Sequence, residues 1–498
     1  MKEVIIIGGG IGGLATAVRL LSKGFKVTIL EKESAVGGKT NMKNDRGFKF
    51  DLTASVLMTP DTYINIFKDV NRNYKDYIDL EILDLLYKIN YYDKTSINIY
   101  SDSRKMINTL EDLEKGLSYK YFKFLEEALE KYLISKEVFL DKPMINKEEF
   151  LNLEVLSSLK TINPLENSYK YISSKISNEK LQQYLLFKTM YIGIDPYKNS
   201  NIYSMIPGIT SLYGLCYVKG GVYNYILALK RLIKELGGVI ELNNEVQKVL
   251  IENKKVIGVK SKNRIIKGDI VICNADYPYA VENLFTCDIG DTSYSKENIK
   301  DKDYSSSVFM IYLGLNKKYD EIKLHNIYIN KNFKDSIESA FKGEIPKNPC
   351  LYFYSPSSID ETICKKGFSA VNIMVRVPNL SFEKVKWNKE TVKNLRNNIV
   401  NTMKNIKGLE DIEDSIIFED YLTPLDLKDK FNSYYGNSFG LSHKITQSLY
   451  KRPHIKSKKI EGLYFIGAST HPGNGVSIII EGSKVLSDLI SNDYKNCF

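Results

Sequence analysis

The hydrophobic pattern is most regular at the start of the chain. Residues 4–7 form a β-branched run that suits a strand buried on both faces, and a glycine-rich turn follows at 8–13. Apolar residues then recur at helical spacing until Gly24, where a helix is expected to end, and residues 27–30 predict a second strand. This stretch therefore predicts a strand, a turn, a helix and a second strand.

The pattern changes further along the chain. From about residue 76 to residue 214 glycines become rare, and amphipathic helices are expected. One helix is predicted at 119–133, with its apolar stripe in the core. The stripe consists of Phe122, Leu125, Leu129, Tyr132 and Leu133. Strand and helix patterns alternate again at 217–284, and strand-like runs beyond residue 301 predict a further sheet. A strand at 462–468 and a helix at 476–490 are predicted near the end.

The turn at 8–13 carries the spacing GxGxxG on Gly8, Gly10 and Gly13. In a strand–turn–helix unit the first glycine makes the tight turn, the second lets backbone approach a pyrophosphate, and the third lets helix and strand pack closely. The pyrophosphate is then expected at the helix N-terminus, beside Ile11 and Gly12. The pattern predicts a dinucleotide site in a Rossmann-type α/β fold, and it leaves FAD and NAD open.

An acidic residue ends the second predicted strand. Glu31 is placed to accept hydrogen bonds from a ribose hydroxyl, and its charge would repel a 2′-phosphate, which argues against NADP. Lys32, next to it, is a further predicted cofactor contact. Gly38 and Lys39 follow in a second glycine loop, which is expected to bring the lysine near the phosphates or the flavin.

The end of the chain is expected to return to the same cofactor. Gly467 and Ala468 end a predicted strand, and Gly475 and Val476 open a predicted helix, so backbone N–H groups can face an anion or a polarised ring edge. Val246, at the start of an earlier strand, is predicted to contact the cofactor as well. Contacts from both ends of one chain suit an extended FAD better than a dissociable NAD. His471 is expected to be structural or to lie beside the flavin.

The fold class that follows is α/β, with a nucleotide-binding domain assembled from discontinuous segments and an inserted substrate domain. The predicted nucleotide-binding segments are 1–75, 215–290 and 416–498. The predicted insertions are 76–214 and 291–415, made of helices and an antiparallel sheet.

Composition excludes several other classes of protein. The six cysteines contain no CxxC and the four histidines show no ligand spacing, so neither a metal site nor a disulfide framework is indicated. The net charge of +10 is spread along the chain, and no nucleic-acid-binding motif accompanies it. No run of eighteen apolar residues occurs, and an intracellular enzyme is expected.

The assembled motifs resemble those of the bacterial FAD-dependent carotenoid (phytoene-type) desaturases, most closely the branch that acts on dehydrosqualene (diapophytoene). The resemblance rests on the nucleotide motif with Glu31, the glycine loop at 37–39, and the runs 47–51, 191–196, 218–221 and 467–475. It implies FAD as cofactor, a long hydrophobic isoprenoid as substrate, and peripheral attachment to the cytoplasmic face of the membrane. It also implies that hydrogens are removed from bonds flanking a conjugated triene, which lengthens the chromophore.

This chain departs from the family pattern near the cofactor and substrate, for example at Asn474 and Ser477. A carotenoid isomerase or saturase on the same scaffold is therefore a second interpretation, and a non-catalytic polyene-binding flavoprotein is a third. A hydrocarbon offers little for polar groups to hold, so no catalytic acid or base is assigned. The chain length of the substrate, the number of steps and the electron acceptor, a quinone or oxygen, stay open.

Overall fold

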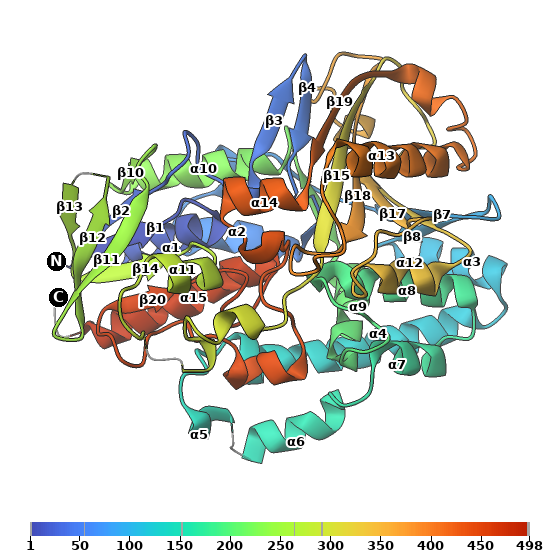
Figure 1. The fold of residues 1–498 in the computed structure, drawn as a ribbon. Helices are drawn as coiled ribbons and strands as arrows, with labels where there is room; N and C mark the ends of the chain where they lie inside the picture. The colour runs from blue at the N-terminus through green and yellow to red at the C-terminus, as the bar shows by residue number, and fades with distance from the viewer. Residues whose placement is uncertain (1, 54, 151–152, 263, 290–291, 496–498) are drawn as a thin grey trace.

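The half of the molecule that contains the predicted nucleotide motif is built on a parallel sheet of five strands (Figure 1). The computed structural model describes residues 2–53, 55–150, 153–262, 264–289 and 292–495. The strands are, in spatial order, β10 (Val239–Glu241), β2 (Lys26–Leu30), β1 (Glu3–Ile7), β14 (Ile270–Cys273) and β20 (Leu463–Phe465). All neighbouring pairs are parallel, so segments from the beginning, middle and end of the chain share one carboxyl edge.

Both faces of this sheet are covered, as its β-branched strands require. Val4 and Ile6 face a layer of three helices, whereas Ile5 and Ile7 belong to a second core. The helices are α1 (Ile11–Ser22), α10 (Val222–Glu235) and α15 (Val476–Asp493). The second core is closed by a three-stranded antiparallel sheet and a short helix, namely β11 (Val246–Glu252), β12 (Lys255–Ser261), β13 (Arg264–Lys267) and α11 (Tyr277–Asn283). The predicted strand–turn–helix–strand unit at the start of the chain is confirmed.

A seven-stranded sheet forms the other half of the molecule. Its spatial order is β19 (Ile416–Leu422), β15 (Ser307–Leu315), β18 (Ser369–Val377), β17 (Leu351–Tyr354), β16 (His325–Ile329), β7 (Leu85–Tyr91) and β8 (Ser96–Tyr100). Only the pairing of β16 with β7 is parallel among the described strands of this sheet. The helix α13 (Lys389–Lys404) packs on it through Leu395, Ile399 and Met403.

A helical layer lies below this sheet in Figure 1. The layer contains α4 (Leu117–Ser135), α7 (Ser168–Lys175), α8 (Glu179–Thr189) and α9 (Met205–Tyr213); the other helices of this part of the chain are α3 (Ser103–Leu113), α5 (Lys147–Phe150) and α6 (Leu153–Ile162), and α5 and α6 lie at the bottom of the view. The smaller elements are η1 (Gly38–Thr40), β3 (Met42–Asp45), β4 (Phe48–Asp51), β5 (Leu57–Met58), α2 (Pro60–Lys68), β6 (Leu80–Ile82), β9 (Leu215–Val218), α12 (Phe333–Ser339) and α14 (Pro424–Phe431). No helix of the described residues has the length and apolar character needed to cross a membrane.

One prediction about the inserted region is wrong, and another is correct only in part. The helical interpretation of 76–214 missed the hairpin of β7 and β8, although both strands are rich in β-branched and aromatic residues. The apolar stripe predicted for α4 matches its buried face only in part: Leu125 is buried, but the rest of that face is formed by residues such as Tyr121, Phe124 and Ala128, and Leu133 is exposed. This helix is apolar on more than one side, so sequence periodicity does not identify the side that packs.

The division into domains stays a prediction. One strand pairs across the proposed boundary at 416, since β19 hydrogen-bonds to β15 in the seven-stranded sheet rather than joining the parallel sheet.

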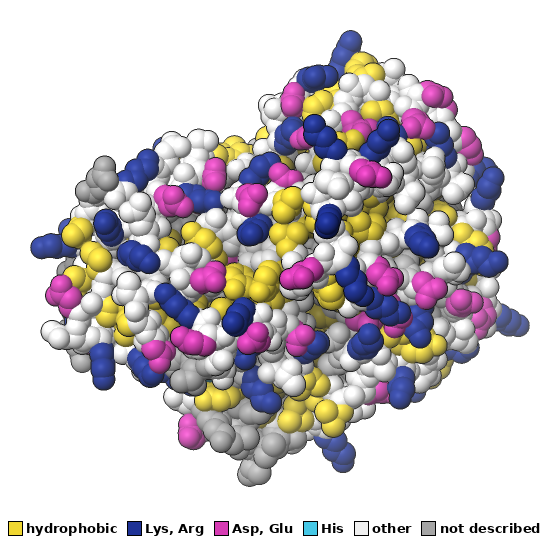
Figure 2. Space-filling view, in the orientation of Figure 1, with side chains coloured by type: hydrophobic (Ala, Val, Ile, Leu, Met, Phe, Trp, Pro, Cys, Tyr) yellow, Lys and Arg dark blue, Asp and Glu magenta, His cyan; other side chains and the backbone are white. Residues whose placement is uncertain are grey.

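The diffuse charge noted in the sequence is visible on the surface. Figure 2 shows Lys and Arg side chains distributed over the whole visible face and interspersed with Asp and Glu.

The packing of α4 on α9 generates a stability prediction. A Cβ on Gly208 of α9 would lie 2.3 Å from the Cβ of Ala128 on α4, so Gly208→Ala should force the helices apart. We expect it to lower the free energy of unfolding by about 1–3 kcal/mol, the typical cost of overpacking, despite the higher helix propensity of alanine. Urea denaturation measures the effect. The double variant Ala128→Gly/Gly208→Ala moves the methyl group to the other helix and should recover most of the loss. Unchanged or increased stability of Gly208→Ala contradicts this account of the packing.

Candidate cofactor and substrate site

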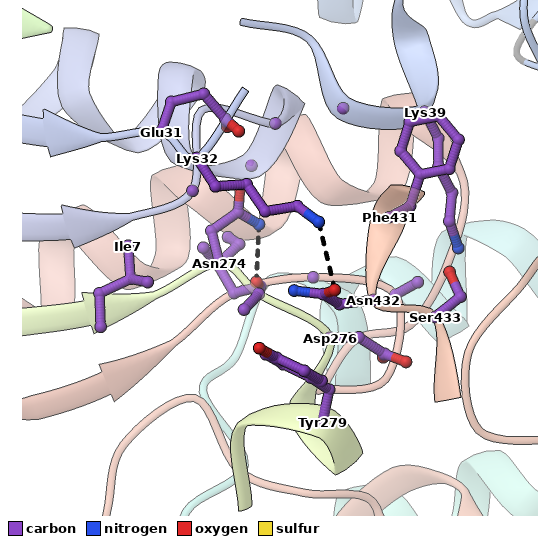
Figure 3. Close-up of a pocket in the computed structure, with 18 of the residues that line it drawn as sticks. Ile7, Glu31, Lys32, Lys39, Asn274, Asp276, Tyr279, Phe431, Asn432 and Ser433 are labelled. Atoms are coloured by element: carbon purple, nitrogen blue, oxygen red, sulfur yellow. Dashed lines mark hydrogen bonds between the residues drawn. The ribbon is translucent and has the colours of Figure 1, made fainter. Parts of the chain in front are cut away.

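A cavity of about 230 Å³ lies at the carboxyl edge of the parallel sheet, where ligands bind in open α/β sheets. We call it the first cavity. Its walls come from the glycine turn, the end of β2, the loop at 37–40, the start of β11, the end of β14, residues 430–433 and residues 466–470. Segments far apart in the sequence therefore meet around one space, and Figure 3 shows their side chains converging on it.

The glycine turn is held by a side chain from another strand. Asn274 directly follows β14, and its Oδ1 accepts the Gly13 N–H at 2.8 Å while its Nδ2 donates to the carbonyl of Ile466 at 2.9 Å. A Cβ on Gly13 would lie 2.4 Å from the Gly8 carbonyl oxygen, which confirms that the third glycine allows close packing of helix and strand. The first-turn N–H groups of Ile11 and Gly12 have no intrahelical acceptor, and both residues border the cavity.

Glu31 is buried at the wall of the first cavity, and its carboxylate already organises the loops. Oε2 accepts the Gly9 N–H at 2.6 Å, and Oε1 accepts the Glu33 N–H at 2.9 Å. Because a carboxylate has about four acceptor positions, lone pairs remain for a ribose hydroxyl. The ribose contact stays a prediction. The structure adds a role that the sequence did not reveal, namely fixing the glycine turn to the end of β2.

Two lysines predicted to contact the cofactor are fixed by residues near 430–440. Lys32 Nζ donates to Asn432 Oδ1 at 3.2 Å, as Figure 3 shows. Lys39 Nζ lies 3.3 Å from the carbonyl oxygen of Asn437. Burial lowers the pKa of Lys39, and the Asp276 carboxylate opposes that shift. Lys39 borders both this cavity and the one next to it, so it stands at the junction between them.

A second cavity, of about 200 Å³, adjoins the first and shares five wall residues with it: Ile11, Lys39, Thr40, Ala468 and Ile479. Gly475 and Val476 border it on the cofactor side. The other walls come from α8, η4 (Met190–Ile192) and the seven-stranded sheet, and they are largely aromatic and aliphatic. The two cavities together form an elongated space that runs from the nucleotide motif into the inserted half of the molecule.

Three buried polar atoms of the second cavity have no hydrogen-bond partner among the described residues. They are Asn474 Oδ1, Ser438 Oγ and Arg376 Nη1. Buried polar groups are normally paired, and unpaired ones near a cavity indicate a ligand with a polar edge. The isoalloxazine ring of FAD carries both carbonyl acceptors and an N–H donor along its edge. The donors and acceptors present therefore fit FAD, with its nucleotide in the first cavity and its ring in the second.

Most of the predicted cofactor residues meet in this space. Thirteen of the fourteen border one of the two cavities, and the exception is Gly13, which packs against β1 instead. Their contacts with the cofactor stay predictions. His471 lies outside both walls, and its Nε2 is 2.9 Å from the Lys142 carbonyl oxygen and 3.0 Å from that of Phe139. This geometry favours the structural interpretation of His471.

Sequence reasoning missed several residues of the first cavity. Asn274, Asp276, Tyr279 and Asn432 all border it, and none was assigned to the site. For Asn274 and Asp276 a signal existed, because polar residues that directly follow a buried parallel strand lie at the ligand-binding edge of the sheet. Asn432 lies in a segment without a motif, so only the folded chain brings it to the cavity. The described residues contain no cluster of His, Cys, Asp and Glu suited to a metal ion.

Replacement of Glu31 tests this placement of the nucleotide. Glu31→Gln keeps the shape but removes the charge, and hydrogen bonds to charged groups contribute about 1.5–3 kcal/mol. We expect FAD affinity to fall about ten- to a hundredfold, with turnover at saturating FAD little changed. Titration of the apoprotein with FAD measures the affinity. A glutamine also presents a donor where Gly9 and Glu33 need two acceptors, so the melting temperature should fall.

The matched control for that experiment is Glu3→Gln, which removes the same charge from an exposed position on β1. It should leave FAD affinity unchanged. Intact affinity with collapsed turnover in Glu31→Gln would place this residue beside the reacting atoms and contradict the arrangement described here.

Comparison with known proteins identifies the family and the cofactor. Residues 11–479 match the family model described as flavin containing amine oxidoreductase. The chain is 34% identical over 497 residues to a 4,4'-diapophytoene desaturase (4,4'-diaponeurosporene-forming) of Staphylococcus haemolyticus, covering 99% of each chain. It is 33% identical to the enzyme of the same name from Staphylococcus aureus, again over 99% of each chain.

Solved structures share the fold at lower identity. An oxidoreductase from Methanosarcina mazei superimposes with a TM-score of 0.64 at 18% identity, covering 98% of this chain and 100% of that one. A putrescine oxidase variant gives a TM-score of 0.66 at 11% identity over 99% of each chain. The chain thus belongs to the flavin containing amine oxidoreductase family and, within it, to the FAD-dependent carotenoid desaturases of the diapophytoene type.

Proposed function

We propose that this protein introduces conjugated double bonds into a long isoprenoid of the dehydrosqualene (diapophytoene) or phytoene type, as a step of carotenoid biosynthesis. The observation that carries the proposal is the second cavity, whose largely apolar walls continue from the predicted ring site at Lys39 and Gly475 into the inserted half of the molecule. An unfunctionalised hydrocarbon is held by shape and exclusion of water, and this cavity supplies both. The curated relatives of similar length are diapophytoene desaturases, which supports the same substrate class.

Different residues of the chain would bind the nucleotide in the first cavity and the ring in the second. The first-turn N–H groups of α1 and the side chains of Glu31 and Lys32 would hold the nucleotide, and the loops around Lys39 and Gly475 would hold the ring. When bound, FAD supplies the hydride acceptor. Tyr191 and other aromatic side chains would align one carbon pair of the polyene and keep water away, which is the contribution that orientation makes to such a reaction.

Product analysis tests the proposed reaction. The purified holoprotein, incubated with dehydrosqualene in vesicles and a quinone, should yield pigments that absorb at longer wavelength and lack two hydrogens for each new double bond. Mass spectrometry and absorbance spectra measure both properties. A product of unchanged mass with altered double-bond geometry would instead identify an isomerase, a gain of hydrogen would identify a saturase, and the absence of any turnover would identify a carrier. Each of these three results contradicts the proposal.

We also propose peripheral contact with a membrane, from which the substrate would enter. Exposed apolar side chains near the ends of the packed helices α4 and α9 support it: Leu133 is 50% exposed, Leu212 43% and Tyr213 39%. The ring centre of Tyr213 lies 5.6 Å from that of Tyr132, the residue before Leu133, so the two helix ends meet here, and exposed apolar side chains at such a place suit contact with lipid. The electron acceptor, a quinone or oxygen, stays a prediction.

Vesicle flotation tests the membrane contact. The wild-type protein should float with vesicles, and Leu133→Asp/Leu212→Asp should lose most of the bound fraction because two charges would enter the apolar layer. Ile265→Asp is the matched control, since Ile265 is 63% exposed but lies on β13, in the other half of the molecule. Equal flotation of the double variant and the control would show that this surface is not the contact.

A further inference from the structure

A lysine is buried in the wall of the second cavity, where a hydrocarbon substrate gives no obvious use for it. Lys188 lies near the end of α8 and is 2% exposed. Its Nζ donates a hydrogen bond to the hydroxyl of Tyr87 on β7. The same nitrogen lies 4.1 Å from the ring centre of Tyr87 and 4.7 Å from that of Tyr191. The amine is thus fixed between two aromatic rings at the cavity wall.

No acidic side chain is found among the described residues that line this cavity. Two further cations line this cavity, namely Lys39 at the junction with the first cavity and Arg376 on β18, whose guanidinium carbon lies 4.4 Å from the ring centre of Phe439. Unpaired buried ammonium groups shift toward the neutral form, because burial and a neighbouring like charge both disfavour the charged form. Burial, with a further contribution from Arg376, lowers the pKa of Lys188 to about 7. A substantial fraction of this amine is therefore neutral at neutral pH.

The other titratable groups near Lys188 line the second cavity or lie beside it, and none of them is a carboxylate that would raise the pKa of the amine again. They are Tyr87 on β7, Tyr191 on η4, His325 on β16, Cys350 and Tyr352 on β17, Arg376 on β18 and Lys39 on η1. Burial raises the pKa of each of these tyrosines and of the cysteine thiol. Burial and the Lys188 charge lower the pKa of His325 to about 3, so this imidazole is neutral.

We propose that the side-chain amine of Lys188 is the base that accepts the proton lost by the substrate when a double bond forms. This inference rests on the proposed function. In the reaction one carbon loses a hydride, for which bound FAD supplies the acceptor. The neighbouring carbon loses a proton to Nζ of Lys188, and the electron pair of that C–H bond becomes the new π bond. The amine becomes an ammonium, and atoms and electrons balance.

The surroundings of Lys188 suit this role better than those of the other groups. The hydroxyls at the wall are weak bases, and His325, although neutral, is absent from the wall and has its Nδ1 2.8 Å from the hydroxyl of Tyr352. The hydrogen bond to Tyr87 holds the amine at the cavity wall. Once protonated, Lys188 is repelled by Arg376, which favours release of the proton between turnovers.

A single-turnover experiment with variants tests the proposal. The holoprotein is mixed anaerobically with neutral vesicles that contain dehydrosqualene, and the appearance of the conjugated product is followed. Lys188→Met should slow this step by about 10²- to 10⁴-fold, the usual contribution of general base catalysis, while bound FAD stays at the wild-type level. The matched control is Lys131→Met, which removes another buried lysine, one outside both cavities that donates to Asn201 Oδ1. It should keep the wild-type rate.

The pH profile separates a base from a structural lysine. Only the neutral amine accepts a proton, so the wild-type rate should rise with pH through about 7, where the pKa of Lys188 lies, and then level off. Arg376→Gln removes the neighbouring positive charge, which should raise the pKa of Lys188 and move the midpoint to higher pH. The profile of Lys131→Met should match that of the wild type. If Lys188→Met fails to bind FAD, its rate is not informative. The shift of the pH midpoint in Arg376→Gln then decides whether Lys188 acts as the base.

Two results overturn the proposal. One is a Lys188→Met protein that keeps the wild-type rate within about threefold, well below the usual general-base effect. The other is an Arg376→Gln protein whose midpoint does not move. Failure of the proposed function is recognised separately, because the wild-type protein itself would then form no desaturated product.

Discussion

The bridge made by the Asn274 side chain is the interaction on which the site depends. It ties the Gly13 N–H to the Ile466 carbonyl and so joins segments separated by 261 and 192 residues. A buried N–H left without its acceptor costs about 1–3 kcal/mol, and here the loss would also release the glycine turn from the end of β20. The space is already tight, since a Cβ on Gly12 or Gly13 would lie 2.9 Å from this side chain. The parallel sheet brings the three chain segments together, and this bridge fixes the glycine turn against the loop at Ile466.

That constraint explains the shape of the rest of the site. With the turn fixed, the helix N-terminus of α1 faces the first cavity, and the loops at Lys39 and Ala468 form the passage into the second. Beyond the passage most of the wall residues are aromatic or aliphatic, and Lys188 and Arg376 lie among them. In such surroundings the pKa of Lys188 is lower than that of a lysine in water. A large fraction of its amine is therefore neutral at neutral pH and able to accept a proton.

The sequence predicted the local parts of this arrangement better than the distant ones. The glycine turn, Glu31 and the C-terminal return follow from patterns within a few residues, because turns, caps and strand ends are locally determined. Asn432 depends on contacts hundreds of residues away, and no local pattern marks it. The buried face of α4 was assigned correctly only in part because apolar residues occur on more than one side of it. In the sequence Lys188 looks like an ordinary lysine near the end of a helix. Only the packing of the folded chain reveals that it is buried.

The central claim is that one FAD molecule lies along both cavities, with its adenosine near Glu31 and its ring in the space that Lys188 borders. A crystal structure of the protein with FAD bound tests it most directly. The account predicts ribose oxygens within hydrogen-bond distance of the Glu31 carboxylate, the pyrophosphate at the N-terminus of α1, and the isoalloxazine ring between the loops of Lys39 and Gly475. A ring held entirely in the first cavity, or an adenosine turned toward the seven-stranded sheet, would contradict it.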